Sequence, residues 1–251
     1  MSIGNKRPQA RGNSQIRRAS LRIMPLGDSI TVGYTDSFTW EVPFSFGYRA
    51  PLYRSLTEAG FSFEFVGASE EPFDNRFGVP SCEDTSPPVV DFRKCGADHH
   101  RGYGGYGIDQ IASNIKRWIK EDIPDLILLM IGINGICSES PAKLKRLVNM
   151  IYTIDPKVSI IIAEITPLIE YDENLFRYNH YIREKLVPTY QERGFTIHGV
   201  DQYTQYLTDP SDPQSINKEC FSNKINHPTN RYYDMIAERW FEVIVAIYPI
   251  L

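Results

Sequence analysis

The pattern of hydrophobic and polar positions predicts strands and helices that alternate along the chain. An apolar run from Leu21 ends abruptly at Gly27-Asp28-Ser29, which is typical of a buried strand followed by a glycine turn. Two later runs are apolar throughout, as strands buried on both faces of a parallel sheet are. Five strands are predicted in all, at residues 21–27, 61–66, 125–131, 158–165 and 195–200.

Helical periodicity fills the segments between these strands. Ile108, Ile111 and Ile115 recur at helical spacing, for example, and Pro188 indicates a break in the longest helix. The expected helices cover residues 47–59, 108–121, 140–154, 171–192 and 228–247. The strand–helix alternation predicts an α/β fold, with a parallel sheet covered by helices on both faces. We expect one domain over residues 21–251, preceded by a disordered tail over residues 1–20.

Composition narrows the classes of function. The chain has 251 residues, 42% of them hydrophobic, and a formal net charge of −4, so nothing points to nucleic acid or an anionic membrane as a partner. No apolar run is long enough to predict a membrane span. The first 22 residues are basic and contain no stretch typical of a secretory signal, which leaves a cytoplasmic and a trimmed secreted protein both open. Oligomeric state is not indicated.

The segment 67–107 is long and has no periodicity, and a loop of this length in a compact domain is usually functional or disordered. It contains Cys82 and Cys95, two of the four cysteines, and whether these two pair is left open. Because no Cys-x-x-Cys pair exists, no structural zinc site is predicted, and no other metal or cofactor is predicted either.

Ser29 is the candidate nucleophile. It follows the glycine turn at the carboxyl end of the first strand, the end that faces the ligand crevice in open parallel sheets. A serine hydroxyl becomes an effective nucleophile when a base removes its proton. The neighbouring Asp28 is interpreted as a turn residue that accepts hydrogen bonds rather than as that base.

The base is expected among the five histidines of the chain. His180 lies in a predicted helix and His198 in a predicted strand, so both are interpreted as structural. His99 and His100 lie in the long loop. His227, in the loop before the last helix, is favoured because that loop should emerge at the same edge of the sheet as Ser29.

Two segments could donate hydrogen bonds to an oxygen on which negative charge develops. Asn134 follows the third strand in Gly132-Ile133-Asn134-Gly135, and its side-chain amide is a donor. The glycine-rich segment 102–107 precedes a helix, and glycine there lets a backbone N–H approach a substrate. Taken singly, Asn134 could equally be a turn or cap residue, and the glycines a flexible loop.

Taken together and in this order, these segments resemble the four sequence blocks of the SGNH hydrolase superfamily, also called GDSL esterases. The resemblance covers about residues 21–247 and maps the blocks onto Ser29, Gly105, Asn134 and His227. It implies a flavodoxin-like, three-layer α/β/α sandwich with a five-stranded parallel sheet. It also implies that Ser29 attacks an ester carbonyl, that His227 is the base, and that the Ser29 N–H, the Gly105 N–H and the Asn134 side chain form the oxyanion hole.

Within this superfamily, four longer segments of the sequence resemble carbohydrate esterase family 3. This branch removes acetyl groups from xylan and related sugars. The segments that carry this similarity are 22–31, 47–52, 65–67 and 100–111. The predicted function is therefore a serine esterase that deacetylates a carbohydrate. An esterase of aryl or lipid esters and a degenerate, non-catalytic carbohydrate-binding protein are the alternatives.

The sequence departs from the family pattern at two positions. Gly135 stands where the family usually has an aspartate after the asparagine. The aspartate that the family places shortly before the histidine is also missing, because the residues there include Asn223 and Lys224. The group that orients His227 could be Asn223, a backbone carbonyl, or an acid of the preceding loop, Asp209 or Asp212.

Aromatic side chains are frequent in the loops expected at the active edge, where they could stack on sugars or pack within the loops. They are Tyr34, Phe38, Trp40, Phe73, Phe77, Tyr103 and Tyr106.

Overall fold

One parallel sheet forms the centre of the molecule. The computed structural model describes residues 20–34, 47–68, 98–222 and 225–249. Five strands are ordered β2-β1-β4-β5-β6, and the short β3 pairs with β1 further along than β2 does. The strands are β1 (Leu21–Gly27), β2 (Phe63–Phe65), β3 (Arg101–Gly102), β4 (Leu126–Met130), β5 (Ser159–Glu164) and β6 (Ile197–Asp201).

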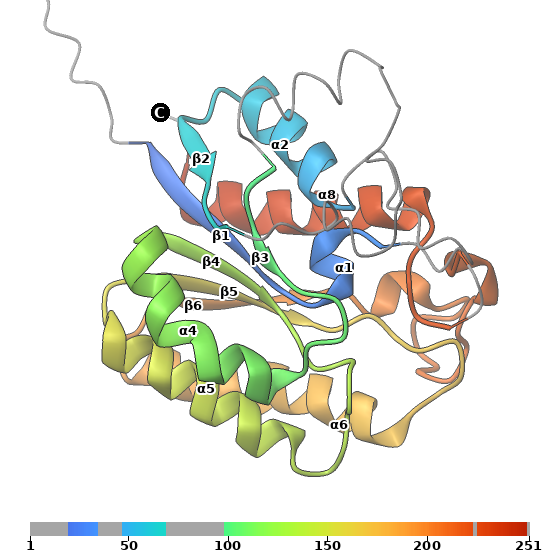
Figure 1. Cartoon of the computed structure of the whole chain (residues 1–251). Coiled ribbons are helices and arrows are strands. Elements are labelled where there is room, and N and C mark those ends of the chain that lie inside the picture. Colours follow the sequence, from blue (N-terminus) through green and yellow to red (C-terminus); the bar gives the residue numbers. More distant parts are fainter. Residues whose placement is uncertain (1–19, 35–46, 69–97, 223–224, 250–251) are drawn as a thin grey trace, which may run out of the picture.

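Helices cover both faces of this sheet, which confirms the predicted α/β/α architecture (Figure 1). On one face α2 (Arg49–Glu58) packs against α8 (Asn230–Ile247), and on the other α4 (Ile108–Asp122) packs against α5 (Ser140–Ile154). The remaining helical segments are α1 (Ser29–Val32), α6 (Glu173–Tyr181), η2 (Ile182–Leu186), α7 (Val187–Glu192), η3 (Thr204–Tyr206) and η4 (Lys218–Cys220).

The core lies between the sheet and its two helical layers. Every residue of β4 and β5 is buried, as the continuous apolar runs predict. The predicted face of α4 is buried as well, including Ile111, Ile115 and Trp118. Burying one such apolar side chain contributes about 1.5–3 kcal/mol. The central strands and the helices against them therefore hold the sheet edge that carries the candidate site.

Strand β3 is an element that periodicity does not reveal, because it has only two residues. Its residue Arg101 is buried and forms a two-point ion pair with Asp122 at the end of α4, at 2.6 and 2.9 Å. The Arg101 guanidinium also lies 5.4 Å from the ring centre of Trp118. These contacts tie β3 to α4, and a strand so short depends on them rather than on its own apolar pattern.

The helix predicted over 171–192 is continuous in space but changes type in the middle. The segment η2 is a π-helix, in which the Val187 N–H donates to the carbonyl of Ile182, and Pro188 follows in the first turn of α7. A proline ring clashes with the carbonyl of an ordinary α-helix four residues earlier and removes one donor. The wider π turn before Pro188 accommodates the proline without ending the helix.

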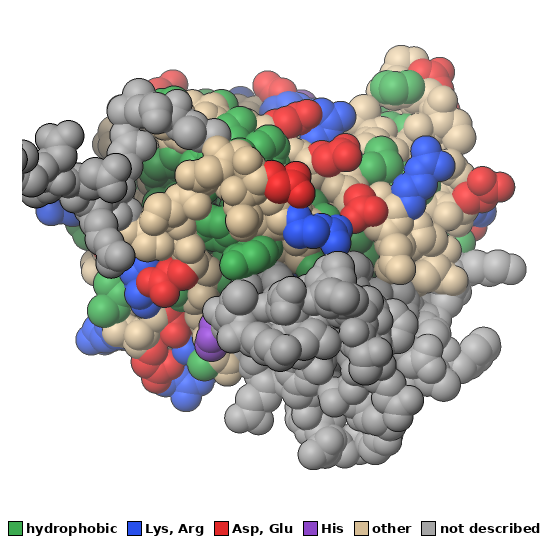
Figure 2. All heavy atoms as spheres, turned by 90° about the horizontal axis from the view of Figure 1, so that it is seen from above, with side chains coloured by type: hydrophobic (Ala, Val, Ile, Leu, Met, Phe, Trp, Pro, Cys, Tyr) green, Lys and Arg blue, Asp and Glu red, His purple; other side chains and the backbone are tan. Residues whose placement is uncertain are grey.

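Charges of both signs are interspersed on the face of the molecule seen in Figure 2. Among the residues that the structure describes, no helix combines the length and the apolar character needed to cross a membrane.

Gly132, just after β4, offers a test of how closely this edge is packed. Its φ is +135°, and a Cβ there would lie 2.9 Å from ring atoms of Tyr178, whose hydroxyl donates to the Ile131 carbonyl at 2.7 Å. We expect Gly132→Ala to lower the free energy of unfolding by about 2–4 kcal/mol, through backbone strain and overpacking. Urea unfolding measures this change.

Gly194→Ala is the matched control, because Gly194 has a φ of +84° but open space where a Cβ would be added. It should cost only the backbone strain, about 1–2 kcal/mol. Equal losses in the two variants would show that the contact with Tyr178 does not matter.

Candidate active site

Ser29 lies at the carboxyl end of β1, where three strands crowd together. Gly27 pairs with Gly102 of β3 on one side and with Met130 of β4 on the other. A Cβ on Gly27 would lie 2.1 Å from the Met130 carbonyl oxygen, so this position accepts only glycine. The chain turns there into α1, and Ser29 is its first residue.

Asp28 caps this short helix. Its carboxylate accepts a hydrogen bond from the Ile30 N–H at 3.0 Å, which is the role predicted for it. The residue is almost completely buried, and burial raises the pKa of its carboxyl group to about 7. The hydrogen bond from Ile30 and the nearby charge of His227 oppose this rise only in part. The turn that positions Ser29 therefore contains an acid that is protonated over much of the range below neutral pH.

His227 reaches Ser29 from the other end of the chain. Its Nε2 lies 2.7 Å from Ser29 Oγ, and both residues are buried. The loop that carries His227 is held by a bridge between Phe221 and Pro228, and the His227 carbonyl accepts the Ser222 N–H at 3.0 Å. The Tyr34 ring packs edge-on against the imidazole, with ring centres 6.1 Å apart. The structure thus brings together the two residues predicted as nucleophile and base.

The other histidines lie elsewhere. His100 Nδ1 accepts the Gly102 N–H at 2.9 Å, and His99 Nδ1 bonds to the Gly67 carbonyl at 2.8 Å. His180 is exposed on α6, and His198 is half-buried on β6, where burial lowers its pKa. His180 and His198 thus lie in a helix and a strand, as predicted.

Gly105 and Asn134 lie at the same edge of the sheet. The segment with Gly105 leaves β3 next to Gly27, whose carbonyl accepts the Tyr103 N–H at 3.2 Å. Asn134 follows β4, and its Nδ2 donates to the Tyr106 carbonyl at 3.0 Å. This hydrogen bond ties the two predicted donor segments to each other. Gly105 has a φ of +75°, a conformation that favours glycine.

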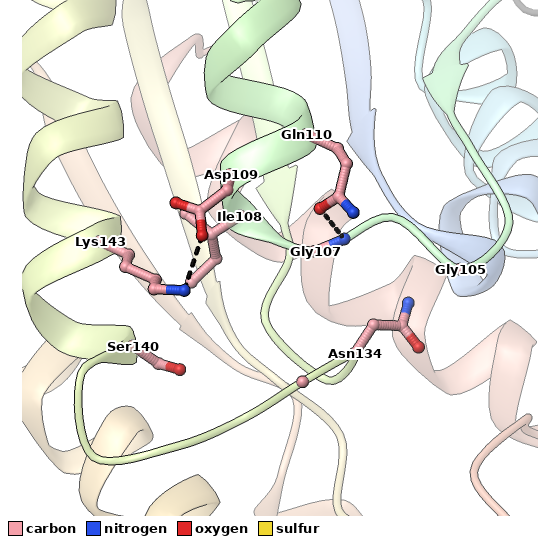
Figure 3. A pocket seen from close by; sticks show the side chains of 9 residues that line it. Gly105, Gly107, Ile108, Asp109, Gln110, Asn134, Ser140 and Lys143 are labelled. Atoms are coloured by element: carbon pink, nitrogen blue, oxygen red, sulfur yellow. Dashed lines mark hydrogen bonds and ion pairs between the residues drawn. The ribbon is translucent and has the colours of Figure 1, made fainter.

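Both residues line a polar pocket of about 270 Å³ (Figure 3). Its walls are the first turns of α4 and α5. The polar side chains that line it are those of Asp109, Gln110, Asn134, Ser140 and Lys143. Asp109 and Lys143 form an ion pair of 2.6 Å across the gap between the two helices.

The acids considered as partners of His227 have other contacts. Asp209 accepts hydrogen bonds from the backbone and hydroxyl of Ser211, and Asp212 accepts the Gln214 N–H. Both acids are exposed, whereas His227 is buried. Their carboxylates stabilise the turn that contains them. Asn223 lies outside the described residues, so its role stays a prediction.

Several other predictions also fall outside the described residues. They concern the basic tail, Cys82, Cys95, Lys224, and the aromatic residues Phe38, Trp40, Phe73 and Phe77. Tyr103 and Tyr106 are described, and their rings stack on each other at 4.9 Å. Tyr103 also stacks on Trp118 at 5.1 Å, so these rings pack within the loop and against α4.

Arg49 supports the site and lies in segment 47–52, which resembles family 3, but the sequence alone suggested no role for it. It is completely buried, and its guanidinium donates to the carbonyls of Thr31 at 2.9 Å and Val32 at 3.1 Å. It thereby satisfies backbone carbonyls at the end of α1, which are orphaned in such a short helix. One signal in the sequence could have indicated this role of Arg49. It is a charged residue that lies among the buried positions of a predicted helix, between Tyr48 and Leu52.

Known proteins with solved structures share the fold of this chain. A family 3 carbohydrate esterase from Clostridium thermocellum is similar over 91% of this chain and 97% of its own, with 26% identity and a TM-score of 0.67. A family 3 carbohydrate esterase from Talaromyces cellulolyticus gives the same TM-score over 90% and 97%, with 20% identity. A GDSL-like lipase from Bacteroides thetaiotaomicron shares the fold over 90% and 88%, with 14% identity and a TM-score of 0.54.

In sequence, a curated protein from Acetivibrio thermocellus with the provisional name endoglucanase X is 33% identical over 78 residues. The match covers 30% of this chain and 34% of that protein. No protein-family model matches the chain.

The chain therefore has the SGNH hydrolase fold, as its sequence blocks predict. The proteins it is similar to include carbohydrate esterases and a GDSL hydrolase, which supports the class of carboxylic ester hydrolases.

Asp28 leads to a prediction about stability and pH. Its carboxyl has a pKa of about 7 in the folded protein against 3.8 as the ordinary value, so the folded state retains a proton that the unfolded state loses. Its contribution to stability is fully present below about pH 4 and is lost as the pH rises through about 7. Asp28→Asn keeps an oxygen that accepts the Ile30 N–H but cannot ionise. Between pH 4 and pH 8 we expect the unfolding free energy of Asp28→Asn to fall less than that of the parent. The difference between the two falls should be on the order of 1–4 kcal/mol.

Glu164, at the end of β5, is the matched comparison. Burial raises its pKa to about 7 as well, in spite of its ion pair with Arg183. Glu164→Gln should remove a separate part of the pH dependence, and the double variant should remove both parts. A pH profile of Asp28→Asn that runs parallel to the parent's would contradict the assignment.

Proposed function

We propose that the protein is a serine esterase that removes short acyl groups, acetyl above all, from a carbohydrate such as xylan. The observation that supports this most directly is the hydrogen bond of 2.7 Å between Ser29 Oγ and His227 Nε2 at the carboxyl edge of the sheet. A serine paired with a histidine in this way is the arrangement used for acyl transfer. The likeness to two family 3 carbohydrate esterases supports the substrate class.

In the proposed mechanism His227 Nε2 takes the proton of Ser29 Oγ as this oxygen attacks the ester carbonyl carbon. The tetrahedral intermediate collapses, the sugar oxygen leaves with the proton from His227, and an acyl-serine remains. Water, deprotonated by His227, then attacks the acyl-serine. This step releases the acid and returns Ser29 and His227 to their starting states.

The oxyanion of each tetrahedral intermediate would be stabilised by the N–H groups of Ser29 and Gly105 and by the Asn134 amide. Asn134 Nδ2 carries two hydrogens, and one of them donates to the Tyr106 carbonyl. This bond fixes the plane of the amide and leaves the second hydrogen for the substrate oxygen. A donor that is oriented before the reaction costs no reorganisation when the charge forms.

Replacement of the nucleophile tests this function. Ser29→Ala should abolish hydrolysis of 4-nitrophenyl acetate, because it removes the oxygen that lies 2.7 Å from His227 Nε2 and forms the acyl-enzyme. A fluorophosphonate probe should label the parent at Ser29 and leave the variant unlabelled. Thermal unfolding should change little, since only one hydroxyl is removed.

Ser55→Ala on α2 is the control and should keep both activity and labelling. Retention of more than a few per cent of the rate by Ser29→Ala would exclude Ser29 as the nucleophile.

The parent protein distinguishes the two alternative functions. If it hydrolyses no short ester, the non-catalytic carbohydrate-binding alternative is favoured. If it cleaves octanoyl esters faster than acetyl esters, a lipid substrate is favoured.

Asn134→Ala tests the oxyanion donor. Loss of one such donor typically lowers kcat by about 10²–10³, and KM should change little because the bond strengthens in the transition state. Asn134→Asp, which keeps the shape but replaces the donor by a negative charge, should be at least as slow. Asn114→Ala on α4 serves as the control, and an unchanged kcat in Asn134→Ala would show that Asn134 is only a turn residue.

A further inference from the structure

We infer that the pocket between the first turns of α4 and α5 binds hydroxyl groups on the alcohol side of the ester, and that Asp109 and Lys143 determine specificity for a hydroxylated leaving group. The inference rests on the proposed function and assigns its substrate contacts. It concerns two side chains to which the family resemblance assigns no role.

The position of the pocket is the first step of the argument. Gly105 and Asn134, the proposed oxyanion donors, belong to its lining, so the pocket begins where the ester oxygen would be bound (Figure 3). Asp109 and Lys143 lie on the side away from Gly105, on two different helices. The Asn134 amide points toward the Gly105 segment, and neither Ser29 nor His227 belongs to the lining, so the part of a bound sugar ester that reaches the ion pair would be hydroxyl groups distant from the ester bond (Figure 3).

The size and polarity of the pocket decide which part of the ester it suits. Its volume of about 270 Å³ corresponds to roughly nine water molecules in the liquid, far more than the methyl group of an acetate fills. Its side chains are mostly polar or charged, so a long acyl chain would desolvate them without replacing their hydrogen bonds. A sugar, which is larger than a methyl group and carries several hydroxyls, fits both properties.

The chemistry of the lining suits hydroxyl groups in particular. A hydroxyl both donates and accepts, so adjacent hydroxyls can donate to the Asp109 carboxylate and accept from the Lys143 ammonium. Ser140 Oγ accepts the Cys137 N–H at 3.0 Å and also lies 3.7 Å from the Cys137 thiol sulfur, so the hydroxyl is held in place at the wall of the pocket. Gln110 Oε1 accepts the Gly107 N–H at 3.0 Å, which orients the side-chain amide. Fixed donors and acceptors of this kind give polar pockets their specificity.

The rim of the pocket is open because of glycine. A Cβ on Gly105 or Gly135 would meet no other atom within 4 Å, and both residues have positive φ. The family resemblance leads us to expect an aspartate at position 135, whose side chain would project into this open space. Gly135, which belongs to the lining beside Asn134, adds no side chain to the pocket.

The ion pair itself contributes little to stability. The Asp109 side chain is 61% exposed and that of Lys143 is 27% exposed, and pairs with this degree of exposure hold proteins together only weakly. Variants of either residue should therefore fold, and their effects on substrates should report on binding.

The experiment compares two acetyl esters with different alcohols, mono-O-acetyl-xylobiose and 4-nitrophenyl acetate. We expect Lys143→Met and Asp109→Asn to lower the ratio of their kcat/KM values by about tenfold, through a higher KM for the sugar ester. Lys145→Met, which replaces an exposed lysine two residues further along α5, should keep the parent's ratio. If the ratio is the same in the parent and in both pocket variants while acetate hydrolysis persists, the subsite is overturned and the esterase function stands.

Calorimetry with the Ser29→Ala protein gives a readout without turnover. Mono-O-acetyl-xylobiose should bind to Ser29→Ala, and its affinity should fall about tenfold when Lys143→Met is added. Loss of affinity in the double variant together with an inactive parent would support the pocket as a sugar site and refute the esterase function. Equal affinity in the single and double variants would overturn the subsite.

Discussion

The crowding at the carboxyl end of β1 is the constraint on which the site depends. Gly27 is paired on both sides, and a Cβ there would lie 2.1 Å from the Met130 carbonyl oxygen. Gly27, Gly102 and Met130 are the last residues of β1, β3 and β4, and they are paired side by side. The segments that follow these three strands therefore leave the sheet next to one another. Ser29, Gly105 and Asn134 come from these three segments. His227 alone arrives from the far end of the chain, and its bond to Ser29 joins the last helix to the first strand.

The fold could be predicted because its signals are local, and the pairing of Ser29 with His227 could be predicted because both follow from the shared edge of a parallel sheet and from the family resemblance. Continuous apolar runs identify β4 and β5, and a glycine turn after a strand identifies the position of Ser29. Strand β3 could not be found in this way, because it is held by the ion pair of Arg101 with Asp122, which are 21 residues apart. Contacts between distant polar side chains leave no periodic pattern in a sequence.

The contacts around the predicted residues, like strand β3, depend on parts of the chain that are distant in sequence. Arg49 is one of two arginines of α2, and only the structure shows that it donates to carbonyls of α1. Asp28 is interpreted as a turn residue from its place beside Gly27, but its pKa of about 7 comes from complete burial. Burial of a polar group depends on all the layers around it, and no single segment encodes it.

The parallel topology explains why a pocket forms at this edge. In such a sheet each strand ends at the same edge at which the next helix begins. Strand ends therefore supply Ser29 and Asn134, and the first turns of the helices supply Asp109 and Lys143. The residues proposed to act on the ester bond at the strand ends are constrained by the close backbone approach, and they occur in short recognisable blocks. The residues that would contact the alcohol, Asp109 and Lys143, stand in the partly exposed first turns of α4 and α5, so substitutions there can change substrate preference without disturbing the sheet.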